Sequence, residues 1–133
     1  MNRPNDAIKV ETTLKDFFAN WLRYLEPLHG LSEKQIQLAS AFLRVRYELS
    51  KKITDDELLD TTVLSTKVRK QIKEELGITT ANFQVILGDL RRHGFIRGNR
   101  FVHKFIPKLD EDRKSYYMLL YFPIKEDSPN EQC

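Results

Sequence analysis

Cysteine is almost absent from this chain of 133 residues, and its one copy is the last residue, Cys133. A single cysteine forms no internal disulfide and leaves no Cys/His cluster of the kind that binds zinc. No apolar run approaches the roughly 18 residues that span a bilayer, and the start, Met1 to Asp6, is polar where a signal peptide is hydrophobic. We therefore expect a cytoplasmic protein without disulfides and without a membrane partner.

Catalytic motifs are also absent. The three histidines, His29, His93 and His103, are far apart in the sequence without His-x-x-x-His spacing, and there is no glycine-rich phosphate loop. The one acidic cluster comprises Asp55, Asp56, Glu57 and Asp60. A capping box and a solvated first turn explain this cluster better than metal binding. We expect no enzyme activity, no cofactor and no metal; His93 is expected to end its helix and to interact with the last carbonyl groups.

Positive charge gathers in the middle of the chain. Residues 63–110 hold 10 Lys/Arg against 4 Asp/Glu, whereas residues 1–62 hold 9 against 10 and residues 111–133 hold 3 against 5. This asymmetry favours an anionic partner for the middle segment, and a solvated charged surface is the alternative interpretation. Hydrophobic residues make up 41% of the chain, which is ordinary for one folded domain of this length.

The N-terminal part has a helical pattern. Apolar residues recur on one helix face over residues 14–25, and Thr13 is placed to cap that helix. A second helix begins with the capping box Ser32-Glu33-Lys34-Gln35 and runs to about Leu49. The repeated capping pattern Thr54-Asp55-Asp56-Glu57 predicts a short third helix, followed by a polar break at residues 60–62.

The middle segment predicts two short helices joined by a tight turn. Leu64, Val68, Ile72 and Leu76 recur at four-residue steps until Gly77 ends the first helix. Thr79 is a suitable N-cap for the second helix, which Gly94 ends. Its buried stripe is expected to consist of Phe83, Ile86, Leu87 and Leu90. Two helices joined by Gly77-Ile78-Thr79 form a helix-turn-helix.

An extended pattern follows Gly94. Residues 95–96 and 100–102 predict a hairpin around the turn Arg97-Gly98-Asn99. A longer hairpin is expected between residues 104–109 and 116–122, with Pro107 at an edge because it has no N–H to donate. Residues 116–122 are apolar at odd and even positions, so both faces should be covered, by the hairpin core and by the N-terminal helices or another chain.

A helix-turn-helix followed at once by Gly94-Phe95-Ile96, a turn and β-strands resembles the winged-helix superfamily, over residues 64–122. The resemblance implies an α+β, mainly α, fold with N-terminal helices followed by a winged helix-turn-helix and its C-terminal β-hairpin wing. We divide this one structural domain into a helical extension that packs on or dimerises the core, the winged helix-turn-helix, and a polar tail; the ranges are 1–62, 63–124 and 125–133. The segments 105–109 and 118–122 also resemble small winged-helix proteins of tailed bacteriophages, including the crAss-like group.

The resemblance places the second helix in a DNA major groove and the wing on the phosphates or in the minor groove. The outward residues expected to contact DNA from that helix are Thr80, Ala81, Asn82, Gln84, Val85, Arg91 and Arg92. Asn82 and Gln84 have side chains that read adenine, and Ala81 or Val85 suits a thymine methyl group. The expected wing and backbone contacts are Lys67, Lys70, Arg97, Asn99, Arg100 and Lys104.

Two functions stay open, because the superfamily includes repressors, replication initiators and protein adaptors. The first is a DNA-binding regulator or replication factor of a phage or mobile element, which acts in the bacterial host cytoplasm on duplex DNA, alone or as a homo-oligomer. The second is a structural or assembly protein of a phage virion, in the head–tail connector region, that packs against other virion proteins. The small outer face of Ala81, Val85 and Gly88, beside Asp89, suits such packing.

Overall fold

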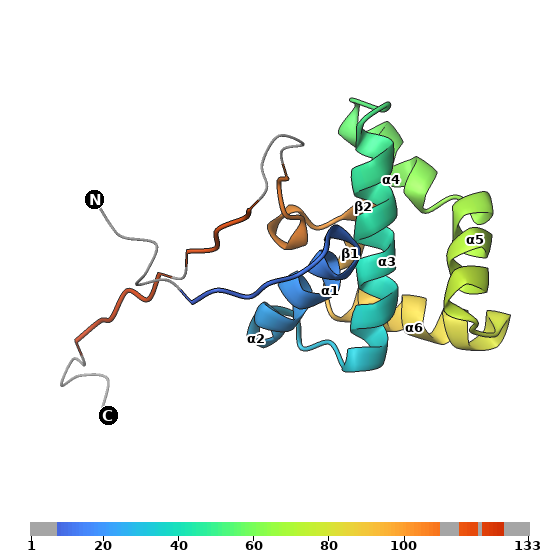
Figure 1. Cartoon of the computed structure of the whole chain (residues 1–133). Coiled ribbons are helices and arrows are strands. Elements are labelled where there is room, and N and C mark those ends of the chain that lie inside the picture. The colour runs from blue at the N-terminus through green and yellow to red at the C-terminus, as the bar shows by residue number, and fades with distance from the viewer. Residues whose placement is uncertain (1–7, 110–114, 120, 127–133) are drawn as a thin grey trace.

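The computed structural model describes residues 8–109, 115–119 and 121–126 (Figure 1). The helices are α1 (Leu14–Tyr24), α2 (Glu26–His29), α3 (Glu33–Ser50), α4 (Asp56–Val63), α5 (Thr66–Leu76) and α6 (Thr80–Arg92). They are followed by β1 (Ile96–Arg97), β2 (Arg100–Phe101) and the 3-10 helix η2 (His103–Phe105). The described chain is therefore mainly helical with a two-stranded antiparallel sheet, which confirms the mainly α, α+β prediction.

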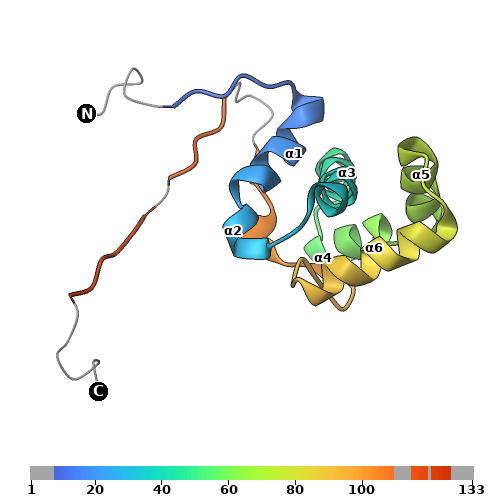
Figure 2. The ribbon, with the colours of Figure 1, turned by 90° about the horizontal axis from the view of Figure 1, so that it is seen from below.

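Helix α3 lies at the centre of the molecule and contacts α1, α4, α5 and α6. In Figure 1 it stands between α1 and α5 and α6 passes its lower end, and Figure 2 looks nearly along α3. The hydrophobic residues that α3 buries are Ile36, Leu38, Ala39, Ala41, Phe42 and Leu43. They point in more than one direction because a helix with neighbours on several sides needs more than one apolar stripe. One buried cluster therefore joins the N-terminal helices to α5 and α6.

The free N–H groups at the starts of α1, α3 and α6 are bound by the capping residues that the sequence predicts. Thr13 accepts the N–H of Asp16 at 3.2 Å and Thr79 accepts that of Asn82 at 3.1 Å. Ser32 forms a complete capping box with Gln35. Each such cap stabilises a helix by about 1 kcal/mol, and these three predicted caps are confirmed.

Helix α4 differs from the prediction at both ends. Its N-cap is Asp55, not Thr54, because the Asp55 carboxylate accepts the N–H of Leu58 at 3.0 Å. The predicted break at residues 60–62 is wrong, since the helix continues to Val63. The two threonines in that range donate their hydroxyls to carbonyl oxygens four residues earlier, at 2.9 and 2.7 Å, which keeps them compatible with a helix.

Aromatic rings link the hairpin to the helices. The row runs, between ring centroids, from Phe83 to Phe42 (6.3 Å), Phe101 (5.7 Å), Phe95 (5.8 Å), Phe105 (5.9 Å) and His29 (5.8 Å). Edge-to-face and offset pairs at such distances contribute roughly 0.5–1.5 kcal/mol each beyond the area they bury. The short hairpin is therefore held by this packing more than by its own ladder, which pairs only Ile96 with Phe101 and Arg97 with Arg100.

The longer hairpin predicted for residues 104–109 and 116–122 is wrong for the part of those segments that the structure describes. The chain turns into η2 instead, and Trp21 Nε1 donates a hydrogen bond of 2.9 Å to the carbonyl oxygen of Phe105. That bond takes an acceptor that a strand ladder would use. Residues 106–109, 115–119 and 121–126 contain no strand, and the predicted connection, 110–114, lies outside the described residues.

Candidate nucleic-acid interface

A three-residue turn, residues 77–79, joins helix α5 to helix α6. Helix α5 buries Val68 and Ile72 and ends at Gly77, whose φ of 66° is the left-handed conformation that glycine adopts without strain. Across the turn, Lys73 Nζ donates to Thr80 Oγ1 at 2.8 Å. The turn and this bond fix the start of α6 relative to α5.

Helix α6 has the two faces that the sequence predicts. Its buried residues are Phe83, Ile86, Leu87 and Leu90. The exposed residues are Thr80, Ala81, Asn82, Gln84, Val85, Arg91 and Arg92, which is the whole predicted recognition set. Val85 is 62% exposed, so a β-branched apolar side chain faces water in the middle of this surface. We call these seven residues the α6 outer face.

Most predicted polar site residues have no partner within the described part of the chain. They are Asn82, Gln84 and Arg91 on α6, Lys67 and Lys70 on α5, and Arg97 and Asn99 in the hairpin. All seven are exposed, so water satisfies their donors and acceptors. Such side chains are available to an external ligand without breaking an internal contact.

Four predicted residues are already engaged inside the molecule. Thr80 accepts from Lys73, Arg92 is paired with Asp89 one turn earlier, and Lys104 Nζ lies 5.1 Å from the Phe105 ring centroid. Arg100 Nε donates to Asp60 Oδ2 at 2.8 Å. This hydrogen bond raises the pKa of Arg100 and directs its charge inward, so Arg97 is the more available cation of the hairpin.

Asp60 positions the hairpin. The side chain is fully buried and accepts from Arg46 Nε at 2.7 Å, from Arg100 Nε at 2.8 Å and from the Phe101 N–H at 3.2 Å. The interpretation of Asp60 as part of a solvated first turn is therefore wrong. A buried carboxylate needs several donors, and the hairpin supplies two of the three. The Asp60 side chain of α4 thus links Arg46 of α3 to Arg100 and Phe101 of β2.

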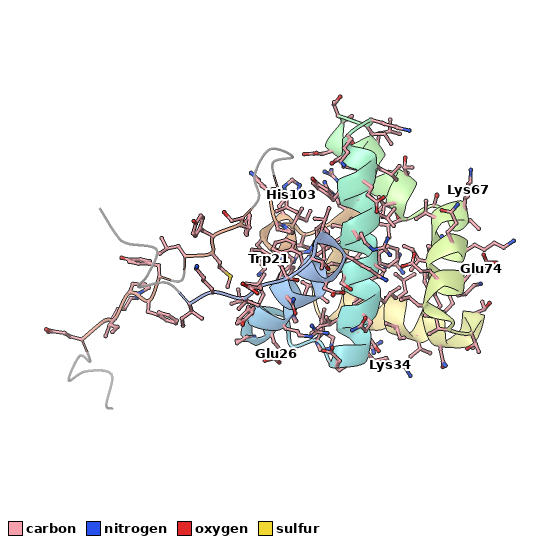
Figure 3. All side chains as sticks on the ribbon, in the orientation of Figure 1. Trp21, Glu26, Lys34, Lys67, Glu74 and His103 are labelled. Atoms are coloured by element: carbon pink, nitrogen blue, oxygen red, sulfur yellow. The ribbon has the colours of Figure 1, made fainter. Side chains whose placement is uncertain are left out.

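The lysines of α5 lie at different distances from α6. Figure 3 shows Lys67 at the end of α5 that lies away from α6, with its side chain pointing away from the body. Lys70 is one turn further along α5, and Lys73 is the residue that reaches α6. Lys73, which donates to Thr80, is therefore the α5 lysine beside the α6 outer face, and Lys67 lies further from it.

Two positioning residues were missed from the sequence. Gln35 Nε2 donates to Asp89 Oδ2 at 3.0 Å, so the Asp89 carboxylate on α6 is held both by Gln35 of α3 and by Arg92. Lys73 was counted only as a basic residue, although its four-residue step to Gly77 places it near the turn. Long-range pairs such as Gln35–Asp89 leave no periodic signal in a single sequence.

The side chains of His29 and His93 contact backbone groups of neighbouring elements. Leu31 N–H donates to His29 Nδ1 at 2.9 Å, and His29 Nε2 is 2.7 Å from the carbonyl oxygen of Leu22, so the buried ring joins α1 to the start of α3. His93 Nδ1 lies 3.0 Å from the carbonyl oxygen of His29. The predicted interaction of His93 with its own helix end is therefore wrong for its side chain, which contacts the α2 end.

No family model, no curated protein and no solved structure matches this chain. Within residues 8–109, 115–119 and 121–126, no group of three His, Cys, Asp or Glu side chains is placed to hold a metal ion. None of the helices in the same ranges has the length and apolar character needed to cross a membrane.

Proposed function

We propose that this chain is a winged-helix DNA-binding protein in which α6 is the recognition helix and β1–β2 is the wing. The observation that carries the proposal is the α6 outer face, where unengaged amide side chains stand on a helix that is fixed by its buried stripe and its capped start. A helix with polar residues near its N-terminal end is what major-groove recognition requires. The proposed role is binding without catalysis.

The chemistry of the α6 outer face fits base edges. Asn82 and Gln84 each present a carbonyl and an amino group, the pair that binds adenine N6 and N7. Val85 and Ala81 are apolar and suit a thymine methyl group. Arg91 and Arg97 are exposed and unengaged, so they supply phosphate contacts from the α6 end and the hairpin.

Fluorescence anisotropy with duplexes enriched from a random library tests the proposal, at about 50 and 200 mM salt. We expect the affinity of the wild-type chain to fall steeply with salt. Arg91→Ala/Arg97→Ala should reduce the slope of log K against log salt by roughly 2, because two phosphate contacts are lost. Asn82→Ala/Gln84→Ala should weaken binding to the enriched sequence and leave binding to unrelated duplexes nearly unchanged.

Lys15→Ala/Lys52→Ala is the matched control, because both lysines are exposed, on α1 and directly after α3, and belong to neither α5, α6 nor the hairpin. This variant should bind like the wild type. No binding at low salt, or equal losses in the control and the Arg91/Arg97 variant, contradicts the DNA assignment.

A second candidate is a structural or assembly protein, such as a phage virion component. It is favoured by one observation, the run of exposed apolar side chains after Tyr116, because such a run is typical of a surface that another protein covers. If the source is a phage, mass spectrometry of purified particles separates the two. The chain is expected in particles if it is a component, and only in the host cytoplasm if it is a regulator or replication factor.

A further inference from the structure

A cavity of about 250 Å³ lies between α3, the start of α4 and the chain that follows the hairpin. Arg46 of α3 and Asp56 of α4 line it, together with His103 and residues 106–109. This volume equals that of roughly eight water molecules. Because pockets for drug-sized ligands are larger, this cavity suits a small organic molecule of about ten non-hydrogen atoms.

Arg46 is the buried cation of the cavity. The residue is 8% exposed, and its Nε donates to Asp60 Oδ1 at 2.7 Å. Its two Nη groups have no hydrogen-bond acceptor among the described residues, since Asp56 Oδ1 lies 3.7 Å from Nη2, beyond hydrogen-bonding distance. A guanidinium stays charged, and its paired N–H groups match the two oxygens of a carboxylate. Arg46 therefore has donors left for an acidic ligand in the cavity that it lines.

The charges around the cavity favour an anion. Asp60 does not neutralise Arg46 alone, because its carboxylate also accepts from Arg100. Lys108 lines the cavity, is exposed, and has no ion pair within the described part of the chain. The lining carboxylate in those residues is Asp56, whose side chain is 59% exposed and screened by water. Two cations therefore line the cavity against one screened anion.

The rest of the lining is largely apolar. Phe18 and Leu43 are buried, and Ile106 and Leu109 are partly buried. An apolar ring or short chain placed against these side chains leaves water, which is favourable. An inorganic anion gains nothing from such contacts. The lining therefore selects an anion that has an apolar body.

We propose that this cavity binds a small carboxylic acid in its ionised form. The carboxylate accepts hydrogen bonds from the Nη groups of Arg46, and the apolar body packs against Phe18, Leu43 and Ile106. This site goes beyond DNA binding, because its lining includes no residue of α6 or of the β1–β2 hairpin. Since Arg46 also binds Asp60, the ligand lies beside the cluster that positions the hairpin.

NMR titration of the purified full chain at pH 7, without DNA, compares three probes. Cyclohexanecarboxylate has both the charge and the apolar ring, cyclohexanecarboxamide has the ring alone, and acetate has the charge alone. We expect saturable binding of the first with a Kd below about 1 mM, and binding of the other two that is weaker by roughly tenfold or more. Backbone amide shifts should concentrate at Tyr47, Ser50 and residues 103–109, which include or border the lining.

Two charge reversals on one segment test the position of the site. Lys108→Glu should weaken binding of cyclohexanecarboxylate by roughly tenfold, because an anion replaces a cation close to the ligand carboxylate. Lys104→Glu is the matched control, since Lys104 is also exposed and does not line the cavity, and it should bind like the wild type. Arg46→Lys keeps the charge beside Asp60 but removes the paired N–H groups. It should lose binding by tenfold or more, with the spectrum of a folded chain as the check on its structure.

Three results would each overturn the proposal. They are no saturable shift with cyclohexanecarboxylate up to about 10 mM, equal binding of cyclohexanecarboxamide, and unchanged binding by Lys108→Glu, which leaves the buried core intact. Because no DNA is present in these titrations, their failure is distinct from a failure of the DNA assignment.

Discussion

The helical body, residues 31–101, and the C-terminal segment, residues 102–109, 115–119 and 121–126, differ in how their groups are satisfied. In the body, helix ends are capped and the apolar stripes of α3 and α6 face each other. In the C-terminal segment, the buried residues are Phe105 and Pro107, and the apolar residues after Tyr116 face water.

The difference shows that an apolar pattern alone does not produce a folded element. In the body, residues that cap or end a helix lie beside apolar helix faces that pack on one another. Each local preference therefore agrees with the tertiary packing. The described C-terminal residues meet the helices through Phe105 and Tyr116, whereas the apolar side chains after Tyr116 are exposed. We therefore expect the effect of a substitution to follow the burial of the groups that it leaves unpaired, from Asp60 through Trp21 to the exposed Arg23–Glu33 pair.

Replacing Asp60 is expected to have the largest effect. Asp60→Ala leaves Arg46, whose side chain is 10% exposed, without its closest carboxylate and leaves the Phe101 N–H without its acceptor. Loss of one partner from a buried charged pair costs about 3–5 kcal/mol, so urea unfolding should show a decrease in the free energy of unfolding of that size. The hairpin amides should also exchange faster with solvent.

Glu57→Ala is the control for Asp60, because Glu57 lies on the same helix and is exposed. It should change the free energy of unfolding by less than about 0.5 kcal/mol. A loss near 1 kcal/mol in Asp60→Ala would show that Asp60 does not hold α4, α3 and the hairpin together.

Removing the Trp21 hydrogen bond is expected to have an intermediate effect, confined to the C-terminal segment. Trp21→Phe keeps an aromatic ring against Tyr116 but removes the donor to the Phe105 carbonyl. An unsatisfied, partly buried carbonyl costs about 1–3 kcal/mol. Limited trypsin digestion should therefore cut faster after Lys104 and Lys108, as followed by mass spectrometry.

Cleavage after Lys70 serves as the internal reference for Trp21→Phe, because Lys70 belongs to the helical body. Its rate should change much less than the rates after Lys104 and Lys108. Equal acceleration at all three sites would mean that Trp21 stabilises the whole domain, and no acceleration would mean that the Phe105 carbonyl is satisfied without it.

Helices α1, α3, α5 and α6 were predictable because their signals are local. Thr13, Ser32 and Thr79 act as caps through hydrogen bonds to residues three positions later, and Gly77 ends α5 with a positive φ. Each of these interactions lies within one turn of helix. The exposure of the α6 outer face followed in the same way, from the 3.6-residue period of its buried stripe.

The errors concern residues whose state is set by distant partners. Asp60 resembles a break-forming residue in a polar run, and only Arg46 and Arg100, 14 and 40 positions away, make it a buried helix residue. Phe105 fits a strand pattern, but Trp21, 84 positions away, binds its carbonyl. Pairings at such separations leave no trace in one sequence, so the role of Asp60 was not predictable.

The exposed ion pair between α1 and α3 is expected to contribute least to the free energy of unfolding. It differs from the Asp60 cluster in its exposure to water. Arg23 Nε donates to Glu33 Oε1 at 3.0 Å, but the two side chains are 43% and 58% exposed. The hydrogen bond from Arg23 lowers the pKa of Glu33 below its ordinary value of 4.5. Because this pKa is depressed on folding, the pair stabilises the folded chain above pH 4.5 and loses that contribution as the pH falls through the folded-state pKa.

We therefore expect Glu33→Gln to reduce the free energy of unfolding at pH 7 by less than about 1 kcal/mol, the range for exposed pairs. The difference from the wild type should shrink as the pH falls below 4.5, and molar salt should reduce it at pH 7. Urea unfolding at pH 7 and pH 3 measures it, with Glu26→Gln on α2 as the exposed control. A difference that is independent of pH would instead assign the effect of Glu33 to packing at the start of α3, because an ion pair is lost once its carboxylate is protonated.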